Sequence, residues 1–410
     1  MKVYKRENYL KRIRGFYHDT EIIKVITGIR RCGKSCLMQS IADELIAAGI
    51  PSENVIYLNL DKREYQKITA SDDLDALIEQ KTAHLPGVKY LFIDEIQNVK
   101  DFELVINGYR EEGDISIFIT VSNSYLLSGE LATKLTGRYL EFELYTLSFE
   151  EYLGMKQFLG KPLQPDLTGE FDLYLAEGGF PKALQYEGMD KQTYVQGVIQ
   201  EIFEKDIRKR VKIRKVSVFD TVQRFIINNF GSTMSLTNML DDLRRNGCEI
   251  KRETLNRYIT ILEDAKIIYP CRRFDLKSRK SIAGEQKYYV ADLGLYYALN
   301  TDARVNYGPA MENVVFIYAK SKGYKVSVGR IGKLECDFIL NMANRDYAYV
   351  QVAMTIMSSR ETEDREYRPF EKIRDNYPKY LMTRNDLIQQ RDGIRHVNAP
   401  SFMKDNRLFI

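Results

Sequence analysis

The chain has 410 residues, of which 44% are hydrophobic and 29% charged, so we expect a globular protein of two or three domains. The net charge of +4 is too small to impose nucleic-acid binding on the whole molecule, and no apolar run reaches the ~20 residues that cross a bilayer. The five cysteines form no C-x-x-C pair, and no apolar core follows the basic segment 1–14, so we expect a cytoplasmic protein without a zinc site or signal peptide.

Apolar runs and helical patterns alternate along the first part of the chain. Strands are predicted at residues 21–27, 54–60, 89–93 and 115–120, and helices at residues 34–48, 73–83 and 102–111. Strands that alternate with helices form parallel sheets covered by helices on both faces. We therefore expect an α/β fold for this part.

The loop between the first strand and the first helix matches G-x-x-x-x-G-K-[ST] at every fixed position. Its glycines allow the backbone to turn N–H groups toward phosphate oxygens, and the helix N-terminus adds a positive dipole end. The motif predicts ATP binding, with Lys34 on the β- and γ-phosphates and Ser35 on Mg²⁺; the alternative is an ordinary strand-to-helix turn. The predicted binding residues are Gly28, Ile29, Arg30, Arg31, Cys32, Gly33, Lys34, Ser35 and Cys36.

An acidic pair ends the third predicted strand. We expect Asp94 to lie beside Mg²⁺, and Glu95 to orient or deprotonate an attacking water. This pair favours water attack over phosphate transfer to a substrate, and the lack of a guanine-reading Asn-Lys-x-Asp stretch argues against a GTPase. Asn123, after the fourth strand, is a candidate contact to the γ-phosphate or the water, with a simple turn as the alternative.

Glycines and prolines interrupt the pattern between residues 151 and 170, which we interpret as a boundary region. Residues 171–265 follow with mostly helical patterns. A helix at 311–320 and strand-like runs at 325–328, 336–340 and 347–353 indicate a second α/β unit. We therefore expect three domains, at residues 1–160, 161–300 and 301–410.

The middle region has the pattern of a winged helix, a variant of the helix-turn-helix. Helices are predicted at 219–230, 236–245 and 251–264, and strand-like runs at 267–274 and 288–290 bracket the charged turn 277–280. Residues 201–215 carry seven basic and three acidic side chains, which favours phosphate contacts. DNA binding is the leading interpretation and protein docking the alternative. The candidate DNA contacts are Lys251, Arg252, Asn256, Arg257, Arg279 and Lys280.

Several of these motifs together resemble an AAA-type ATPase family that is widespread in archaea and bacteria. The resemblance lies in residues 28–35, 94–95, 119–124, 135–139 and 147–151, and continues through 178–181, 205–207, 287–295 and 335–338. It implies an ATP hydrolase in which a strand-tip polar residue, here Asn123, acts as a sensor. Arg138 matches an arginine that senses nucleotide or acts across subunits, with a surface arginine as the alternative. Val121 stands where the family usually has glycine.

The family resemblance also implies that the carboxy-terminal part combines a winged helix with a fold related to restriction-type nucleases. Such nucleases place a helix glutamate, a strand-end aspartate and an E/Q-x-K strand around Mg²⁺. Glu312, Asp337 and Gln351 match these positions, but Ala353 stands where the lysine belongs and provides no donor to the attacked phosphate. We therefore expect a degenerate, structural or DNA-holding domain.

The leading hypothesis is an ATPase, dependent on ATP and Mg²⁺, whose nucleotide state controls a carboxy-terminal module that contacts DNA. The first alternative is a nucleotide-switched scaffold that forms homo-oligomers and docks proteins through its winged helix. The second is a nuclease gated by ATP.

Overall fold

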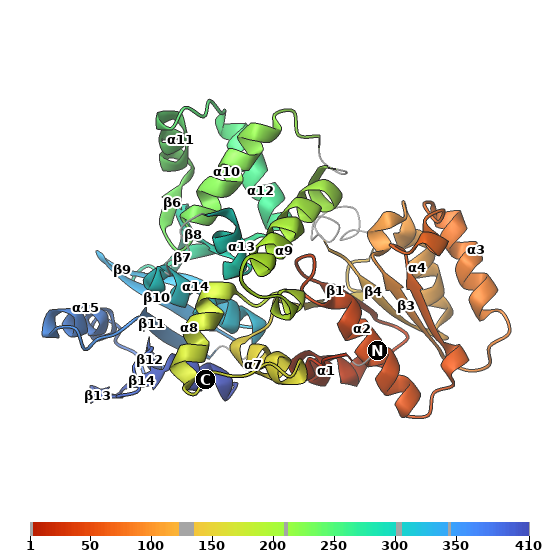
Figure 1. The fold of residues 1–410 in the computed structure, drawn as a ribbon, viewed down its shortest axis with the longest axis horizontal. Coiled ribbons are helices and arrows are strands. Elements are labelled where there is room, and N and C mark those ends of the chain that lie inside the picture. The colour runs from red at the N-terminus through yellow and green to blue at the C-terminus, as the bar shows by residue number, and fades with distance from the viewer. Residues whose placement is uncertain (1–2, 123–134, 209–211, 301–305, 343–345, 410) are drawn as a thin grey trace. The chain divides into compact units, whose positions relative to one another are not determined.

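The computed structural model describes residues 3–122, 135–208, 212–300, 306–342 and 346–409, which belong to two compact units, Met1–Leu144 and Tyr145–Ile410 (Figure 1). Each unit has its own sheet. None of the helices in these ranges combines the length and apolar composition needed to cross a membrane.

The first unit is built on a five-stranded parallel sheet in the order β2-β3-β4-β1-β5. The predicted alternation of strands and helices is present, and element ends differ from the expected ones by one or two residues. In chain order the elements are α1 (Glu7–Ile13), β1 (Ile23–Thr27), α2 (Lys34–Ala47), β2 (Val55–Asn59), α3 (Ser71–Thr82), β3 (Lys89–Asp94), α4 (Phe102–Glu112), β4 (Ile115–Thr120) and β5 (Tyr139–Glu143).

The central strands of this sheet are buried along their whole length. Every residue of β1 and β4 is buried, as expected for parallel strands covered on both faces. The apolar core joins these strands to α3 and α4 through Leu74, Ile78, Phe102 and Ile106. This is the sheet of a P-loop nucleotide-binding fold, and it confirms the predicted α/β class.

The second unit begins with helices and ends on a mixed sheet. Its first elements are α7 (Phe149–Phe158), α8 (Leu167–Glu177), α9 (Gly188–Glu201), α10 (Val216–Asn228), β6 (Thr233–Ser235), α11 (Leu236–Arg245), α12 (Arg252–Asp264), β7 (Ile268–Asp275), β8 (Lys280–Val290) and α13 (Leu293–Leu299). They are followed by α14 (Tyr307–Ser321), β9 (Lys325–Ile331), β10 (Leu334–Asn341), β11 (Tyr347–Ala353), α15 (Arg360–Glu371), β12 (Lys379–Thr383), β13 (Gln390–Arg391), β14 (Ile394–Asn398) and α16 (Ala399–Lys404).

Nine strands of this unit form one sheet, in the order β13-β14-β12-β11-β10-β9-β7-β8-β6. The strands around the charged turn 277–280 are β7 and β8, which pair antiparallel, and β7 also pairs in parallel with β9. The strands of the expected middle domain therefore continue the sheet of the expected last domain. The three-domain division itself stays a prediction.

Two of the family motifs in this unit meet at a buried aspartate. The Asp292 carboxylate accepts hydrogen bonds from the backbone N–H groups of Gly179 (2.8 Å) and Gly294 (2.8 Å). A Cβ atom at Gly178 would lie 1.9 Å from Asp292 Oδ1, so only glycine fits there. Burial raises the pKa of Asp292 to about 6, while these donors and Thr146 act in the opposite direction.

Candidate nucleotide-binding site

The strand order of the first unit brings the P-loop and the acidic pair to one edge of its sheet. Parallel strands end at the same edge, and the P-loop follows β1, while Asp94 ends β3. The strand β4 lies between β1 and β3, so its tip separates the P-loop strand from the acidic pair. Side chains from β2 and β4 can therefore contact the acids from both sides.

The P-loop has the backbone that its glycines predict. Gly28 has φ of 138° and Gly33 has φ of 108°, and a Cβ atom on Gly28 would lie 2.1 Å from the carbonyl oxygen of Leu144. Gly33 has no side chain with which to cap α2, so the first N–H groups of that helix are left for another acceptor. The buried Lys34 ammonium donates to the carbonyl oxygens of Gly28 (3.0 Å) and Ile29 (3.4 Å).

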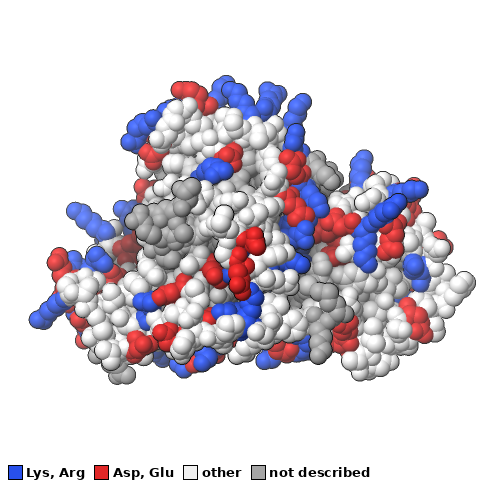
Figure 2. Space-filling model, in the orientation of Figure 1, with Lys and Arg blue, Asp and Glu red and all other residues white. Residues whose placement is uncertain are grey.

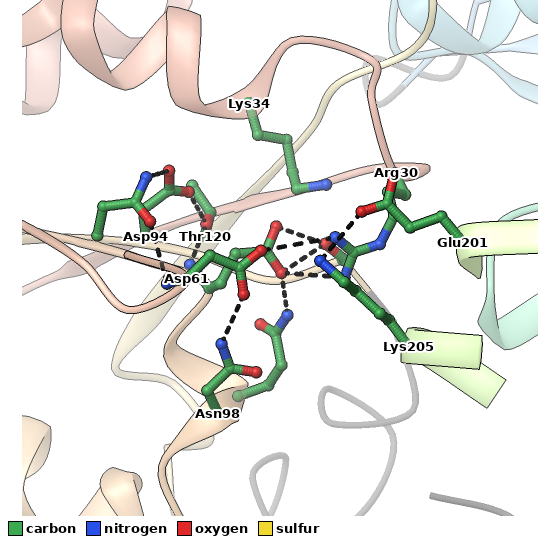
Figure 3. A network of polar contacts seen from close by, with 12 residues as sticks. Arg30, Lys34, Asp61, Asp94, Asn98, Thr120, Glu201 and Lys205 are labelled. Carbon is green, nitrogen blue, oxygen red and sulfur yellow. Dashed lines mark hydrogen bonds and ion pairs between the residues drawn. The ribbon is translucent and has the colours of Figure 1, made fainter. Parts of the chain in front are cut away.

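Asp94 is buried and held on both sides. The Thr120 hydroxyl accepts from the backbone N–H of Glu95 (2.8 Å) and donates to Asp94 Oδ1 (2.6 Å), as Figure 3 shows for Asp94 and Thr120. From β2, the side-chain amide of Asn59 donates to Asp94 Oδ2 (3.2 Å) and the Tyr57 hydroxyl lies 3.5 Å from the same oxygen. Burial and the neighbouring Asp94 carboxylate raise the pKa of Tyr57. The position of the Asp94 carboxylate is therefore fixed by groups on two neighbouring strands.

Glu95 has an unusual backbone for a carboxylate residue. Its φ of 58° and ψ of 45° lie in the left-handed region, which costs a residue with a Cβ roughly 1 kcal/mol. Its buried side chain accepts from the Ser122 hydroxyl, which lies 2.8 Å from Oε1 and 2.9 Å from Oε2, and from the Gln97 side-chain amide. This conformation directs the carboxylate away from the line of β3 toward the tip of β4.

Arg30 was predicted as one of the residues of the binding loop. Its side chain also contacts two carboxylates outside the loop. Its guanidinium lies 3.6 Å from Glu95 Oε2 and 3.9 Å from Asp61 Oδ2, and the side chain is buried. Asp61 in turn accepts from Asn98 (3.0 Å), a contact that Figure 3 shows. The loop is thereby linked to the segments that follow β2 and β3.

The two remaining predicted catalytic residues are Asn123 and Arg138. Asn123 lies outside the described residues. Arg138 lies before β5, and its backbone carbonyl accepts from the N–H of Ile23, the first residue of β1. Its guanidinium donates to Asn107 Oδ1 (3.0 Å) and lies 3.7 Å from Glu111. Since the P-loop follows the other end of β1, Arg138 is at the opposite edge of the sheet.

The nuclease-like residues come together in the second unit, with a lysine that the sequence analysis did not identify. Lys287, on β8, donates to Glu312 Oε2 (3.0 Å) and pairs with Glu335 Oε1 (2.9 Å). Burial raises the pKa of Glu312, and the Lys287 ammonium acts in the opposite direction. An amino group is therefore present beside Glu312, although position 353 is alanine.

The other two nuclease-like residues are engaged within the protein. Asp337 Oδ2 accepts from the backbone N–H of Val352 (2.8 Å), and Gln351 Oε1 accepts from that of Asp337 (3.3 Å). Gln351 also donates to Glu366 (3.0 Å). Within the described residues, no three His, Cys, Asp or Glu side chains are grouped as a metal site. The cluster is therefore satisfied by internal hydrogen bonds and ion pairs.

The candidate DNA contacts lie on exposed positions of the second unit. The structure has α12 where the third helix of the winged-helix pattern is predicted, and a turn between β7 and β8 where the charged turn 277–280 is predicted. Arg252 lies 3.4 Å from the Thr237 hydroxyl and Arg257 lies 3.4 Å from the Lys212 carbonyl oxygen. All six candidate side chains are exposed: Lys251, Arg252, Asn256, Arg257, Arg279 and Lys280.

Comparison with known proteins identifies the family of this chain. A family model described as an AAA domain matches residues 20–153, and one described as a domain of unknown function matches residues 168–305. An uncharacterized protein of Haemophilus influenzae is 35% identical over 379 residues, which cover 92% of both chains. The chain belongs to the same AAA-domain family. The predicted AAA-type P-loop assignment is therefore confirmed.

Two further matches have lower sequence identity to this chain. An uncharacterized protein of Methanocaldococcus jannaschii is 29% identical over 379 residues, covering 89% of this chain and 82% of its own. A solved Walker-type ATPase of Pyrococcus abyssi has 14% identity and a TM-score of 0.49, over 72% of this chain and 95% of that one.

Some residues of the AAA-domain site were missed by sequence reasoning. Asn59 ends β2 just as Asp94 ends β3, and the two strand ends pair with each other. Alignment of strand ends at one edge of a parallel sheet is a signal that could have identified Asn59. Thr120 and Ser122 belong to the strand tip that was already singled out, but which of its side chains faces Glu95 depends on the conformation of the tip.

Proposed function

We propose that this chain binds ATP together with Mg²⁺ at residues 28–36 and hydrolyses the nucleotide. The observation that carries the proposal is the meeting of Lys34, Asp94 and Glu95 at one edge of the parallel sheet. Each is held by a group from outside its own strand or helix. Pre-positioned charges of this kind are what phosphoryl transfer to water requires.

The residues of the loop fit a nucleotide phosphate. Gly28 has no room for a side chain, and the N-terminus of α2 offers N–H groups to an anion. The Lys34 ammonium, which donates to two loop carbonyls, is free of any carboxylate partner among the described residues and can turn to phosphate oxygens.

The residues next to the loop fit a magnesium ion. Ser35 is exposed at the start of α2, and Asp94 presents carboxylate oxygens at the end of β3. A hydroxyl and a carboxylate are oxygen ligands of the kind that Mg²⁺ takes beside phosphates. When bound, the ion neutralises charge on the phosphate oxygens.

Glu95 has the position expected of the group that activates water. Its carboxylate lies at the same edge as the P-loop and is kept in place by Ser122, Gln97 and the guanidinium of Arg30. Asp94, held in place by one hydrogen bond each from Thr120 and Asn59, keeps acceptor sites on its oxygens and has the positioning that suits a metal ligand. The two adjacent carboxylates therefore have distinct roles.

The proposed binding site is tested by equilibrium binding of a fluorescent ATP analogue in the presence of Mg²⁺. Lys34→Ala should weaken binding at least about tenfold, because the loop loses the ammonium that the motif directs at the β- and γ-phosphates. Lys62→Ala, which removes an exposed lysine after β2, is the matched control and should bind as wild type. Equal affinity of the two variants would refute this assignment.

We further propose that the nucleotide state controls a DNA-contacting module built from α10, α11, α12 and the strands β6, β7 and β8. Three helices followed by an antiparallel pair are the arrangement of a winged helix, which supports this reading. Figure 2 shows Lys and Arg side chains gathered at the outer end of this helical part. Exposed basic residues on α12 and on the turn would contact phosphates.

The DNA role is tested by measuring ATP hydrolysis with and without duplex DNA at 50 and 200 mM salt, concentrations over which phosphate contacts lose about 10³-fold or more in affinity. Stimulation that fades at the higher salt supports the proposal. Light scattering of the same samples addresses the alternative of a nucleotide-switched scaffold. Assembly driven by ATP without any response to DNA would favour the scaffold, and shortening of the DNA would favour the ATP-gated nuclease.

A further inference from the structure

A cavity of about 780 Å³ opens on the sheet of the second unit, and none of its lining residues belongs to the candidate nuclease cluster. It is lined by the turn between β7 and β8, the turn between β9 and β10, the start of β11 and the segment that follows α15. This volume lies within the range of ~300–1,000 Å³ that small-ligand pockets occupy. The cavity is thus large enough for a nucleotide.

Aromatic rings form part of the cavity wall. Phe274, Tyr347, Tyr349 and Tyr377 all line it, and the rings of Tyr347 and Tyr377 lie 5.2 Å apart between centroids. Tyr377 is 40% exposed, whereas Tyr349 is 3% exposed. Exposed rings of this kind provide the faces on which an unpaired base stacks.

The rim of the same cavity is basic. Lys277, Arg279, Lys333, Lys372 and Arg374 line it and are exposed. Within the described residues, none of the five forms an ion pair, whereas other exposed basic residues of the unit do, such as Arg224 on α10 and Arg245 on α11. The five charges come from three separate segments and are available to an anionic ligand.

Among the described residues, one acidic residue lines the cavity, and its carboxylate is already engaged. Asp375 accepts from the Tyr349 hydroxyl (2.6 Å) and from the backbone N–H of Tyr377 (3.2 Å). These contacts hold the segment that carries Arg374 and Tyr377 against β11. The acid therefore fixes the wall, and the balance of charge around the opening stays strongly positive.

We propose that this cavity binds a nucleotide whose base is unpaired, with its phosphates on the basic rim and its base against the rings of Tyr347 and Tyr377. Lysine and arginine neutralise phosphates, and an aromatic face accepts any base, so the combination suits a single-stranded nucleic acid or a free nucleotide. An acidic peptide would use the rim and leave the rings unused. This site shares Arg279 with the proposed duplex contacts but otherwise lies beyond them, and it does not depend on the P-loop.

The proposal is tested by fluorescence anisotropy with a labelled 12-nucleotide single strand and the full chain carrying Lys34→Ala, so that the P-loop cannot contribute. The rim variant Lys333→Glu/Arg374→Glu and the ring variant Tyr377→Ala should each weaken binding about tenfold. The control Lys182→Glu/Lys404→Glu makes the same charge change at two other exposed lysines of the unit and should bind as its parent.

Competition separates the possible sources of the ligand. Displacement of the strand by AMP would assign the cavity to a free nucleotide, and displacement only by oligonucleotides would assign it to a strand. Both results support the proposal. It is overturned if polyglutamate competes as well as the oligonucleotide, or if Tyr377→Ala binds as its parent. Since the proposed duplex contacts are tested separately, through stimulation of ATP hydrolysis by duplex DNA, failure of this site is distinguishable from failure of the proposed DNA role.

Discussion

Glu95 is the residue in which backbone strain, burial and hydrogen bonding coincide. It adopts a left-handed conformation that favours glycine, and its carboxylate is held by the Ser122 hydroxyl at 2.8 and 2.9 Å. Strain of this kind persists where the surrounding structure imposes it, and it gathers at functional sites. We infer that Ser122 acts as a positioning residue for Glu95.

Ser122→Ala tests this role. Loss of the hydroxyl leaves the carboxylate with fewer fixed donors, so turnover should fall about tenfold, the effect of about 1.4 kcal/mol, while ATP affinity is unchanged. Ser122→Thr, which keeps a hydroxyl, should recover part of the rate. Steady-state kinetics with Ser52→Ala, an exposed serine, as control provide the measurement. A rise in KM without a change in kcat would contradict the positioning role.

In the second unit, Lys287 is also held by neighbouring side chains, which here are two carboxylates. Its ammonium is buried between Glu312 (3.0 Å) and Glu335 (2.9 Å). Removing one partner of a buried ion pair leaves an uncompensated charge, which costs roughly 3–5 kcal/mol. We infer that this lysine serves the stability of the unit.

Lys287→Met should therefore lower the free energy of unfolding by roughly 3–5 kcal/mol, measured by urea denaturation. Adding Glu312→Gln to the same chain removes one of the buried negative charges and should restore part of the loss. Lys320→Met, a partly exposed lysine on α14, is the control. If the double variant is no more stable than the single one, Lys287 does not stabilise the unit by balancing the charge of Glu312.

At the scale of elements, strand β1 leads into the P-loop and also contains a buried lysine that affects stability. Its Lys24 side chain is completely buried, donates to the Ser116 hydroxyl (2.8 Å) on β4, and lies over the ring of Phe118. Burial lowers the pKa of Lys24 to about 7, with Asp19 opposing the shift. Burial of Lys24 therefore destabilises the folded protein by an amount that depends on pH.

The sign of that dependence follows from proton binding. Between pH 7 and about pH 10.4 the unfolded chain binds a proton that the folded chain releases, so stability rises with pH over this window. Lys24→Met should raise the melting temperature at pH 7, and the gain should shrink toward pH 9.5. Thermal unfolding of both proteins at the two pH values provides the measurement. A gain of equal size at both values would show that titration of Lys24 is not the cause.

The elements of the first unit were predictable because each buried strand is a short apolar run between polar loops. The order of the strands was not, and it is the insertion of β4 between β1 and β3 that brings Thr120 and Ser122 to the acids. In the second unit, the pairing of β7 with β9 joins segments far apart in the chain, and local patterns carry no information on such pairing.

The candidate site was predictable where chemistry requires a residue type at a given spacing, as in the P-loop and the pair Asp94-Glu95. The site was less predictable where a residue's role depends on the direction in which its side chain points. Asn123 was chosen at the tip of β4, whereas Ser122 is the described residue that contacts Glu95. Lys287 could not be identified, because it reaches Glu312 from a different strand than the motif specifies.

For the whole molecule, the position of Arg138 bears on assembly. The five residues of β1 separate it from the P-loop, which at about 3.3 Å per residue is a distance of roughly 15 Å. An arginine at that distance does not contact phosphates bound to its own chain. We infer that any catalytic role of Arg138 is played at the site of a second copy.

Mixing inactive variants tests this inference. Arg138→Ala keeps an intact P-loop, and Lys34→Ala keeps an intact Arg138, so assemblies that contain both can form complete sites. The mixture should hydrolyse ATP faster than the sum of the two proteins measured separately. Arg138→Ala with full activity by itself would show that the residue serves only its contacts with Asn107 and Glu111 on α4.

The central claim, that this chain hydrolyses ATP by means of the acidic pair, is tested most directly by the rate of phosphate release at saturating ATP and Mg²⁺. Glu95→Gln keeps the size of the side chain and one acceptor oxygen for Ser122 but cannot accept a proton from water. It should bind ATP as wild type and release phosphate at least about 100-fold more slowly. Equal rates for Glu95→Gln and wild type would contradict the account.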